Sequence, residues 1–198
     1  MSQRTASVKR ETRETKIEID LNLDGQGNCT CRVGLGFLEH MLELLAAHAR
    51  IDLKIQAQGD VQVDEHHLTE DLGITLGQAI DKALGTKKGI ERYGFVLLPM
   101  DEVLVAVAVD LGGRFAFCCN YRPQRELIGD LSTELIPHFF RSLAVAAKCN
   151  LHFKFLNRGE NEHHRIEAMF KGFARSLRMA VHIDREAKGQ IPSTKGVL

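Results

Sequence analysis

The chain contains one motif twice, as Asp64-Glu65-His66-His67-Leu68-Thr69-Glu70 and as Asn161-Glu162-His163-His164-Arg165-Ile166-Glu167. Both copies read Glu-His-His-x-x-Glu. The similarity continues without a gap, because residues 71–84 align with residues 168–181 and apolar residues match at most helix-spaced positions. Each copy of the motif is therefore predicted to begin an amphipathic helix.

A second similarity precedes each motif. The stretch 40–48 aligns with 138–146, and each leads into an alternating strand, at 51–55 or 149–153. The upstream histidine lies 26 residues before the histidine pair in the first half and 25 residues before it in the second. We therefore predict two tandem copies of one supersecondary unit, at residues 1–92 and 93–198, fused into one domain.

The remaining patterns predict a mixed fold. Period-two alternation or a continuous apolar run predicts strands at 15–23, 29–33, 51–57 and 103–111, and helical periodicity predicts helices near 37–48 and 134–147 in addition to the motif helices. Because strands and helices alternate unevenly in each half, the predicted fold class is α+β, with two fused two-layer repeats.

Composition argues against several classes of function. Lys+Arg and Asp+Glu both number 26, so no net charge attracts nucleic acid or an anionic membrane surface. The longest apolar run, Val103–Val109, is far shorter than the roughly 20 residues that span a bilayer, and the N-terminus has no apolar signal core. Five cysteines without a C-x-x-C pair indicate neither a disulfide framework nor a thiolate zinc site. We expect a cytoplasmic protein.

The repeated histidines and glutamates suggest metal ligands. On a helix, residues four apart share a face, whereas adjacent residues diverge by about 100°. One ion is therefore not expected to bind both histidines of a pair together with the glutamate. With the two upstream histidines, the set divides evenly into two sites of three histidines and one glutamate each: His40, His66, His67, Glu70, His138, His163, His164 and Glu167.

These ligand types suit manganese, iron, zinc, cobalt or nickel, and they do not choose among them. A polar helix start is the structural alternative for each pair taken alone, since a first-turn carboxylate is favoured by the helix dipole. The in-register second copy, with its own upstream histidine, favours the metal interpretation.

Five ordered motifs give the chain a resemblance to the imidazoleglycerol-phosphate dehydratase family of histidine biosynthesis, and they extend over nearly its whole length. They are Gly36–Leu42, Glu65–Asp71, Leu98–Glu102, Gly159–Lys171 and Pro192–Gly196. The resemblance implies a duplicated β-α-β sandwich with a four-stranded sheet and two helices per repeat. It also implies a hydro-lyase that converts imidazole glycerol phosphate to imidazole acetol phosphate and water.

The same resemblance implies roles for individual residues. It makes the eight histidines and glutamates above the ligands of two Mn²⁺ ions per active site. It places Glu14 and His48 against the substrate, with Glu14 as the candidate acid/base, and it assigns the substrate phosphate to Arg92, Arg114, Lys171, Ser193 and Lys195. It further implies a homo-oligomer of twenty-four chains, built from trimers, with sites at the contacts between subunits.

The chemistry of this reaction explains the need for two metals. The proton to be removed lies on a carbon with no neighbouring carbonyl, so an unassisted base would find it too weakly acidic. An imidazolate held by a metal at each ring nitrogen would act as an electron sink, able to form a diazafulvene-like intermediate as a hydroxyl departs. A carboxylate that is not a ligand, such as Glu14, can shuttle the protons.

Three other functions fit part of the pattern. A metal-storage or metal-sensing oligomer would explain the histidine clusters but not the Ser193-Thr194-Lys195 tail. An RNA-binding protein is disfavoured by zero net charge and the lack of an aromatic-basic stripe. A dinuclear metallohydrolase is the nearest enzymatic alternative.

Overall fold

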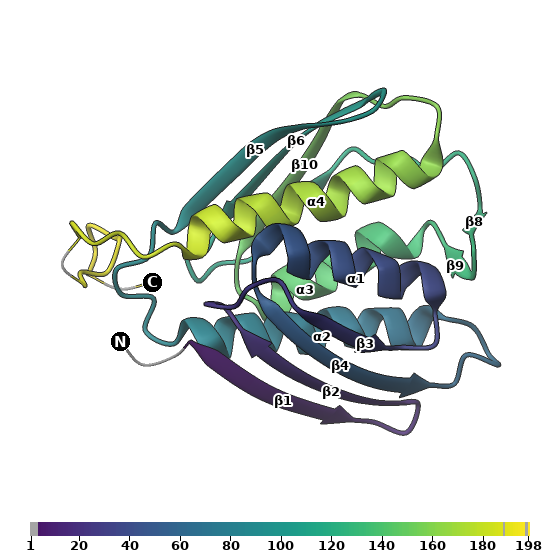
Figure 1. Ribbon diagram of the computed structural model, residues 1–198, viewed down its shortest axis with the longest axis horizontal. Helices are drawn as coiled ribbons and strands as arrows, with labels where there is room; N and C mark the ends of the chain where they lie inside the picture. The colour runs from purple at the N-terminus through teal and green to yellow at the C-terminus, as the bar shows by residue number, and fades with distance from the viewer. Residues whose placement is uncertain (1–3, 188, 197) are drawn as a thin grey trace.

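Two four-stranded sheets enclose four helices in the computed structural model, which describes residues 4–187, 189–196 and 198 (Figure 1). The first half contains β1 (Thr5–Glu11), β2 (Thr15–Asn22), β3 (Cys29–Arg32), α1 (Gly36–Ala49), β4 (Asp52–Gly59) and α2 (His66–Leu84). The second half contains β5 (Tyr93–Met100), β6 (Val103–Asp110), β7 (Ala116–Cys119), β8 (Leu127–Ile128), β9 (Leu131–Ser132), α3 (Leu135–Ala146), β10 (Asn150–Asn157) and α4 (Glu162–Val181). No helix in these ranges is long and apolar enough to cross a membrane.

The two sheets have the same topology. Their strand orders are β1-β2-β4-β3 and β5-β6-β10-β7, and in each the first three strands are antiparallel while the last pairs parallel to its neighbour. The α+β class and the internal duplication are therefore confirmed. The second half adds only the small β8-β9 hairpin before α3.

Two edge strands, β1 and β5, lie where the patterns predicted no strand. Strand β1 buries Ala6 and half-buries Val8, so its apolar signal is weak. Strand β5 is apolar on both faces and contains Gly94 and Pro99, which conceal its alternation. Both lie at a sheet edge, where fewer neighbours constrain the composition of a strand.

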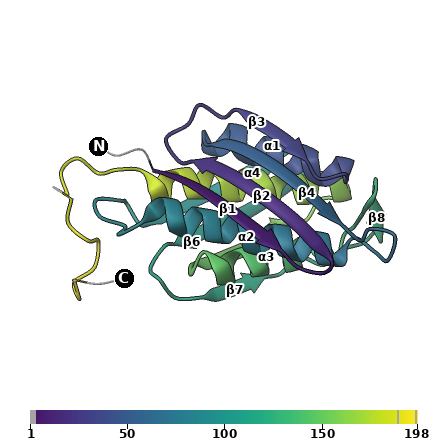
Figure 2. The same ribbon diagram turned by 90° about the horizontal axis from the view of Figure 1, so that it is seen from below.

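Each motif helix packs against the upstream helix of the other half. Helix α2 contacts α3, and α4 contacts α1, while α2 also covers β1 and β2 and α4 covers β5 and β6. Figure 2 shows the first sheet lying across the helices when they are seen from below. The helices of each pair run parallel, and all four begin at the same end of the molecule (Figure 1).

Two glycines allow the closest of these contacts. A Cβ atom on Gly73 would lie 2.6 Å from the carbonyl oxygen of Phe139, and one on Gly77 would lie 2.4 Å from that of Leu143. Helix α2 therefore approaches the backbone of α3 at a distance that no side chain would permit. This close approach holds the start of α3, with His138, beside the start of α2.

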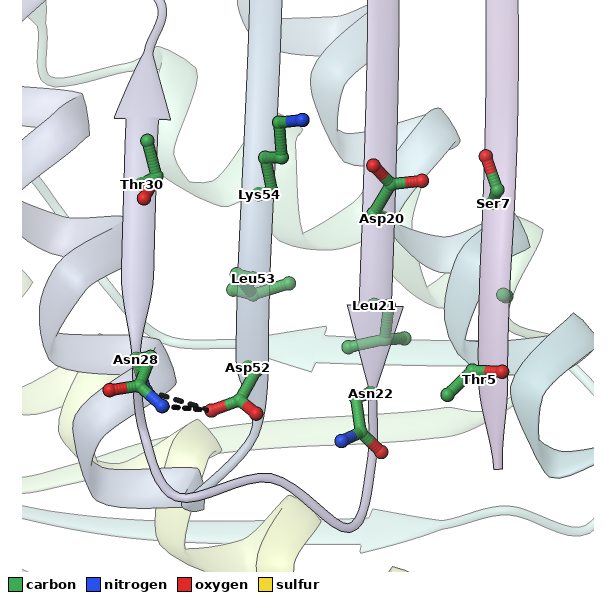
Figure 3. Close-up of a pocket in the computed structure, with 11 residues that line it drawn as sticks. Thr5, Ser7, Asp20, Leu21, Asn22, Asn28, Thr30, Asp52, Leu53 and Lys54 are labelled. Carbon is green, nitrogen blue, oxygen red and sulfur yellow. Dashed lines mark hydrogen bonds between the residues drawn. The ribbon is translucent and has the colours of Figure 1, made fainter. Parts of the chain in front are cut away.

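The outer faces of the two sheets differ in character. Neighbouring strands of the first sheet present Ser7, Asp20, Lys54 and Thr30 around a shallow hollow of about 490 Å³, beside which Asn28 donates to Asp52 (Figure 3). The second sheet instead exposes the apolar side chains Tyr93, Phe95, Leu97 and Leu156. Side chains of this size on one face are typical of a surface that another protein covers.

Replacing Gly77 with alanine is expected to destabilise the protein by about 1–3 kcal/mol, because the added methyl group must push α2 away from α3. In an unconstrained helix the same change stabilises by roughly 0.5–1 kcal/mol. Chemical denaturation measures the change in the free energy of unfolding. A decrease indicates the close contact, and an increase indicates an unconstrained helix. Gln78→Ala, on the exposed side of the same turn, is the control and should change stability by no more than about 0.5 kcal/mol. A stabilised Gly77→Ala protein would contradict the packing argument.

Candidate metal and substrate site

The common end of the four helices carries two clusters of candidate ligands that contain upstream histidines. One contains His40, His163 and Glu167, and the other contains His66, Glu70 and His138. A third group of candidate ligands, within the second half, contains Asp101, Glu102 and His164. Within each cluster the ligand atoms lie within 4.8 Å of one another. Each cluster joins the two halves, because the upstream histidine comes from one repeat and the motif residues from the other.

Helix geometry places the motif residues as predicted. His66 Nε2 lies 3.7 Å from Glu70 Oε2, and His163 Nε2 lies 3.1 Å from Glu167 Oε2, each across one helical turn. His138 Nε2 approaches the other oxygen of Glu70 at 3.4 Å. Each glutamate therefore lies where it could share a cation with two imidazoles.

The donor atoms fit a divalent transition-metal ion. The Nε2 atom of His138 is buried and has no hydrogen-bond partner among the described residues. A buried polar atom without a partner is costly, and a bound cation would satisfy it. Two imidazoles and one carboxylate per cluster also match the ligand preferences of such ions.

The second histidine of each motif lies outside both clusters. His67 Nδ1 lies 3.1 Å from Asp60 Oδ2, and His164 Nδ1 lies 2.9 Å from Glu102 Oε2. Adjacent residues on a helix diverge by about 100°, which accounts for the separation. Within one chain, the predicted division into three histidines and one glutamate per site is therefore not present.

These carboxylates perturb the titration of the two histidines. The hydrogen bond to Asp60 raises the pKa of His67, and the hydrogen bond to Glu102 raises the pKa of His164. The backbone N–H of Asn161 and the His164 imidazole together lower the pKa of Glu102 to about 2. Glu102 is therefore ionised throughout the physiological pH range.

Local hydrogen bonds fix the helix starts that carry these residues. Asn161 caps α4 by accepting from the backbone N–H of His163, and Asp64 accepts from that of His66.

A buried arginine holds the start of α4 in the second half. Arg165 is 1% exposed and forms an ion pair with Glu162. Its guanidinium also donates to three further oxygen atoms, which belong to the Arg158 carbonyl, the Gly159 carbonyl and the Gln124 side chain. Nothing in the sequence pattern indicated that this arginine is buried.

The β8-β9 hairpin ties the first half to the second at the same end. Asp130, in its turn, accepts from the backbone N–H groups of Gly36 and Phe37 at the start of α1. Glu65 accepts from the backbone N–H of Ser132. The insertion therefore holds the starts of both first-half helices in place.

Lys171 and His48 lie farther along the helices, on the side of the His40 cluster. Lys171 Nζ is 2.5 Å from Glu167 Oε1. Burial raises the pKa of Glu167, but the hydrogen bond and the charge of Lys171 outweigh it and lower the pKa overall. Burial, together with the charges of Lys171 and Arg175, lowers the pKa of His48.

Glu14 lies in the turn between β1 and β2, at the same end as the clusters. Its carboxylate is 3.8 Å from His67 Nδ1, its side chain is 52% exposed, and the carboxylate accepts no hydrogen bond from the described residues. A carboxylate without a fixed partner can exchange protons with a bound molecule.

The other predicted phosphate-binding residues line a separate cavity of about 260 Å³, formed by Arg92, Gly112, Gly113, Arg114, Ser193, Thr194, Lys195 and Leu198. Arg92 already forms two hydrogen bonds to Asp110 and donates to the Pro192 carbonyl. The exposed Arg114 and Lys195 are the cations with no such partner within the described ranges.

This cavity lies at the opposite end of the chain from the clusters. The backbone N–H of Arg92 donates to the carbonyl of Ala180, near the end of α4, whereas His163 lies at its start. Twenty helical residues span about 30 Å. A small substrate cannot contact both ends of one chain.

Comparison with known proteins identifies close relatives. A sequence model described as imidazoleglycerol-phosphate dehydratase matches residues 33–177. The imidazoleglycerol-phosphate dehydratase of Rhodopirellula baltica is 53% identical over 197 residues, covering 100% of this chain and 96% of its own. The crystal structure of the Staphylococcus aureus enzyme superposes with a TM-score of 0.81 at 37% identity and covers 90% of this chain and 99% of its own. The Pyrococcus furiosus enzyme, solved in complex with (S)-C348, gives a TM-score of 0.81 at 32% identity and covers 96% and 100%.

Proposed function

The chain belongs to the imidazoleglycerol-phosphate dehydratase family, and on that premise we propose that it uses two divalent metal ions, with Mn²⁺ the first candidate, to dehydrate imidazole glycerol phosphate. The enzyme is a hydro-lyase of histidine biosynthesis. The observation that carries the proposed metal dependence is the pair of matching His-His-Glu clusters, one of which contains the buried and unpaired Nε2 of His138.

Bound metal ions would supply Lewis acidity at the nitrogens of the substrate ring. The net reaction removes the hydroxyl from the carbon next to the ring and a proton from the following carbon, and the resulting enol tautomerises to the ketone. Glu14 is the proposed group that moves the proton, because the cluster glutamates Glu70 and Glu167 are occupied by their histidines. Arg114, Ser193 and Lys195 are proposed to hold the phosphate.

The proposed site is shared between chains of a homo-oligomer. Three observations support this proposal: each cluster offers only three ligands, His67 and His164 point away from both clusters, and the cavity with Lys195 lies about 30 Å from them. The exposed apolar side chains Phe95 and Leu97 supply a surface for self-association. The family resemblance sets the proposed size at twenty-four chains built from trimers.

The purified protein is expected to hold close to two divalent ions per chain, and His66→Ala or His163→Ala should lose metal and dehydratase activity together. Elemental analysis measures the metal, and an assay with imidazole glycerol phosphate measures the activity before EDTA treatment, after it, and after Mn²⁺ is restored. His182→Ala, an exposed histidine at the end of α4 away from both clusters, is the control for metal content. Full metal content in both cluster variants, or activity that survives complete chelation, would refute the proposed metal dependence.

Glu14→Gln is expected to keep its metal and to bind substrate, while turnover falls by roughly 10²-fold or more because the amide cannot exchange the proton. Steady-state kinetics with metal analysis on the same sample tests this expectation. An unchanged turnover number would remove Glu14 from the mechanism.

Shared sites predict complementation between two inactive variants. Glu14→Gln alters the cluster end and Lys195→Ala alters the far cavity, so a site built from one end of each chain can regain both side chains in a mixed assembly. Because metal ions stabilise the assembly that binds them, EDTA should dissociate the oligomer and Mn²⁺ should rebuild it.

The measurement is dehydratase activity after the two variants are dissociated together and reassembled, with light scattering to follow size. Each variant treated alone is the control. Mixed assemblies of full size that show no gain in activity would place each active site within one chain.

A further inference from the structure

We propose that Asp60 and Glu102 are positioning residues that hold His67 and His164 with the proton on Nδ1 and the lone pair of Nε2 free for a metal ion. This inference rests on the proposed metal dependence. It concerns the two histidines that neither cluster contains, and nothing in the sequence pattern pointed to either carboxylate as their partner.

The hydrogen-bond geometry decides which ring nitrogen is available. Asp60 places its two oxygens 3.1 and 3.2 Å from His67 Nδ1, and Glu102 places Oε2 2.9 Å from His164 Nδ1. An ionised carboxylate can only accept, so Nδ1 must donate. A neutral imidazole has one donor, and Nε2 is therefore the ligand atom. In His164 this Nε2 lies 3.4 Å from Asp101 Oδ2, so an ion bound there would lie beside that carboxylate.

Backbone hydrogen bonds hold the Glu102 carboxylate and the main chain of Asp60. Glu102 uses Oε1 to accept from the backbone N–H groups of Glu160 and Asn161, at 3.1 and 2.9 Å, and keeps Oε2 for His164. It therefore joins the turn between β5 and β6 to the start of α4. Asp60 directly follows β4, and its own backbone N–H donates to the carbonyl of Glu14.

Strand register shows that the two halves perform this task with different residues. Ile17 pairs with Ala57 in the first sheet, and Val105 pairs with Phe155 in the second. Glu14 and Glu102 precede these strands at equivalent positions, yet Glu14 stays 3.8 Å from its histidine nitrogen. In the first half the Asp60 carboxylate accepts from that nitrogen, and the Glu14 carboxylate has no hydrogen-bond partner among the residues that the structure describes.

The second half has no equivalent of Asp60. Asn157 lies seven residues before His164, as Asp60 lies seven before His67, and its amide donates instead to the Glu102 carbonyl. At the position seven residues before the second histidine, Asn157 therefore donates to the Glu102 carbonyl in one repeat, whereas Asp60 accepts from the histidine itself in the other. Equivalent glutamates in the two halves now differ in role.

The test measures Mn²⁺ affinity by competition with a fluorescent chelator, using full-length Asp60→Ala and Glu102→Ala. Loss of such a partner typically weakens metal binding about 10–100-fold. Asp60→Asn and Glu102→Gln should recover most of the loss, because an amide oxygen still accepts from Nδ1–H. Glu14→Gln, which alters a carboxylate near the same histidine without removing a hydrogen bond, is the matched control and should bind Mn²⁺ as the parent does.

A second measurement reports the histidine tautomer directly and distinguishes a change of tautomer from a loss of folding. In metal-free protein labelled with ¹⁵N-histidine, at a pH at which the imidazoles are neutral, His67 and His164 should give the Nδ1–H pattern, and Asp60→Ala should abolish it for His67 alone. Thermal melting identifies any variant that fails to fold. Glu102 also accepts from the two backbone N–H groups just before α4, so Asp60→Ala carries the test if Glu102→Ala is unfolded.

The outcomes separate the two proposals. A folded Asp60→Ala protein with parental Mn²⁺ affinity, together with an Nε2–H tautomer in the parent protein, would overturn the positioning role. Retention of metal by His66→Ala and His163→Ala would instead overturn the proposed metal dependence on which it rests.

Discussion

The pairing of each motif helix with the upstream helix of the other half is the constraint on which the site depends. Neither half contains a cluster of its own, because His40 must reach α4 and His138 must reach α2. Gly73 and Gly77 allow α2 to lie directly against the α3 backbone. This contact sets how far His138 lies from α2. A core that packed each half only against its own sheet would bury as much apolar surface, but it would leave the histidines apart.

Parallel helix pairs then concentrate the chemistry at one end. The four helix starts, the turns that carry Glu14 and Glu102, and the end of β4 with Asp60 all meet there (Figure 1). Helix N-termini favour negative charge, and the carboxylates at this end are stabilised by it. The basic residues Arg114 and Lys195 lie instead at the opposite end, where the helices finish. One chain therefore separates its proposed ring-binding and phosphate-binding groups, and the proposed contact between chains would bring them together.

Sequence alone was sufficient for the duplication and for the positions of the four helices, because a repeated apolar period and a repeated motif report local structure. The face shared by His66 and Glu70 followed from the helix period as well. The cross-half pairing did not follow, since it depends on whether a helix packs against its own neighbour or its duplicate, and the apolar stripe is the same in both cases. The roles of Asp60 and Arg165 were not predicted for a related reason. Their hydrogen-bond partners depend on where a strand ends and how a loop folds, and residue type alone predicts neither.

The duplication also explains how two equivalent carboxylates came to differ. Glu14 and Glu102 occupy the same place before the second strand of their sheets, and each faces the outlying histidine of its own half. Because Asp60 holds His67, Glu14 does not orient it, and its half-exposed carboxylate is available for the proposed proton transfer. Glu102 accepts from two backbone N–H groups and one imidazole, which keeps its pKa near 2 and leaves it a poor proton acceptor. A single added hydrogen-bond partner thus distinguishes the two repeats: it leaves one glutamate available for the proposed proton transfer, while the other is held by hydrogen bonds.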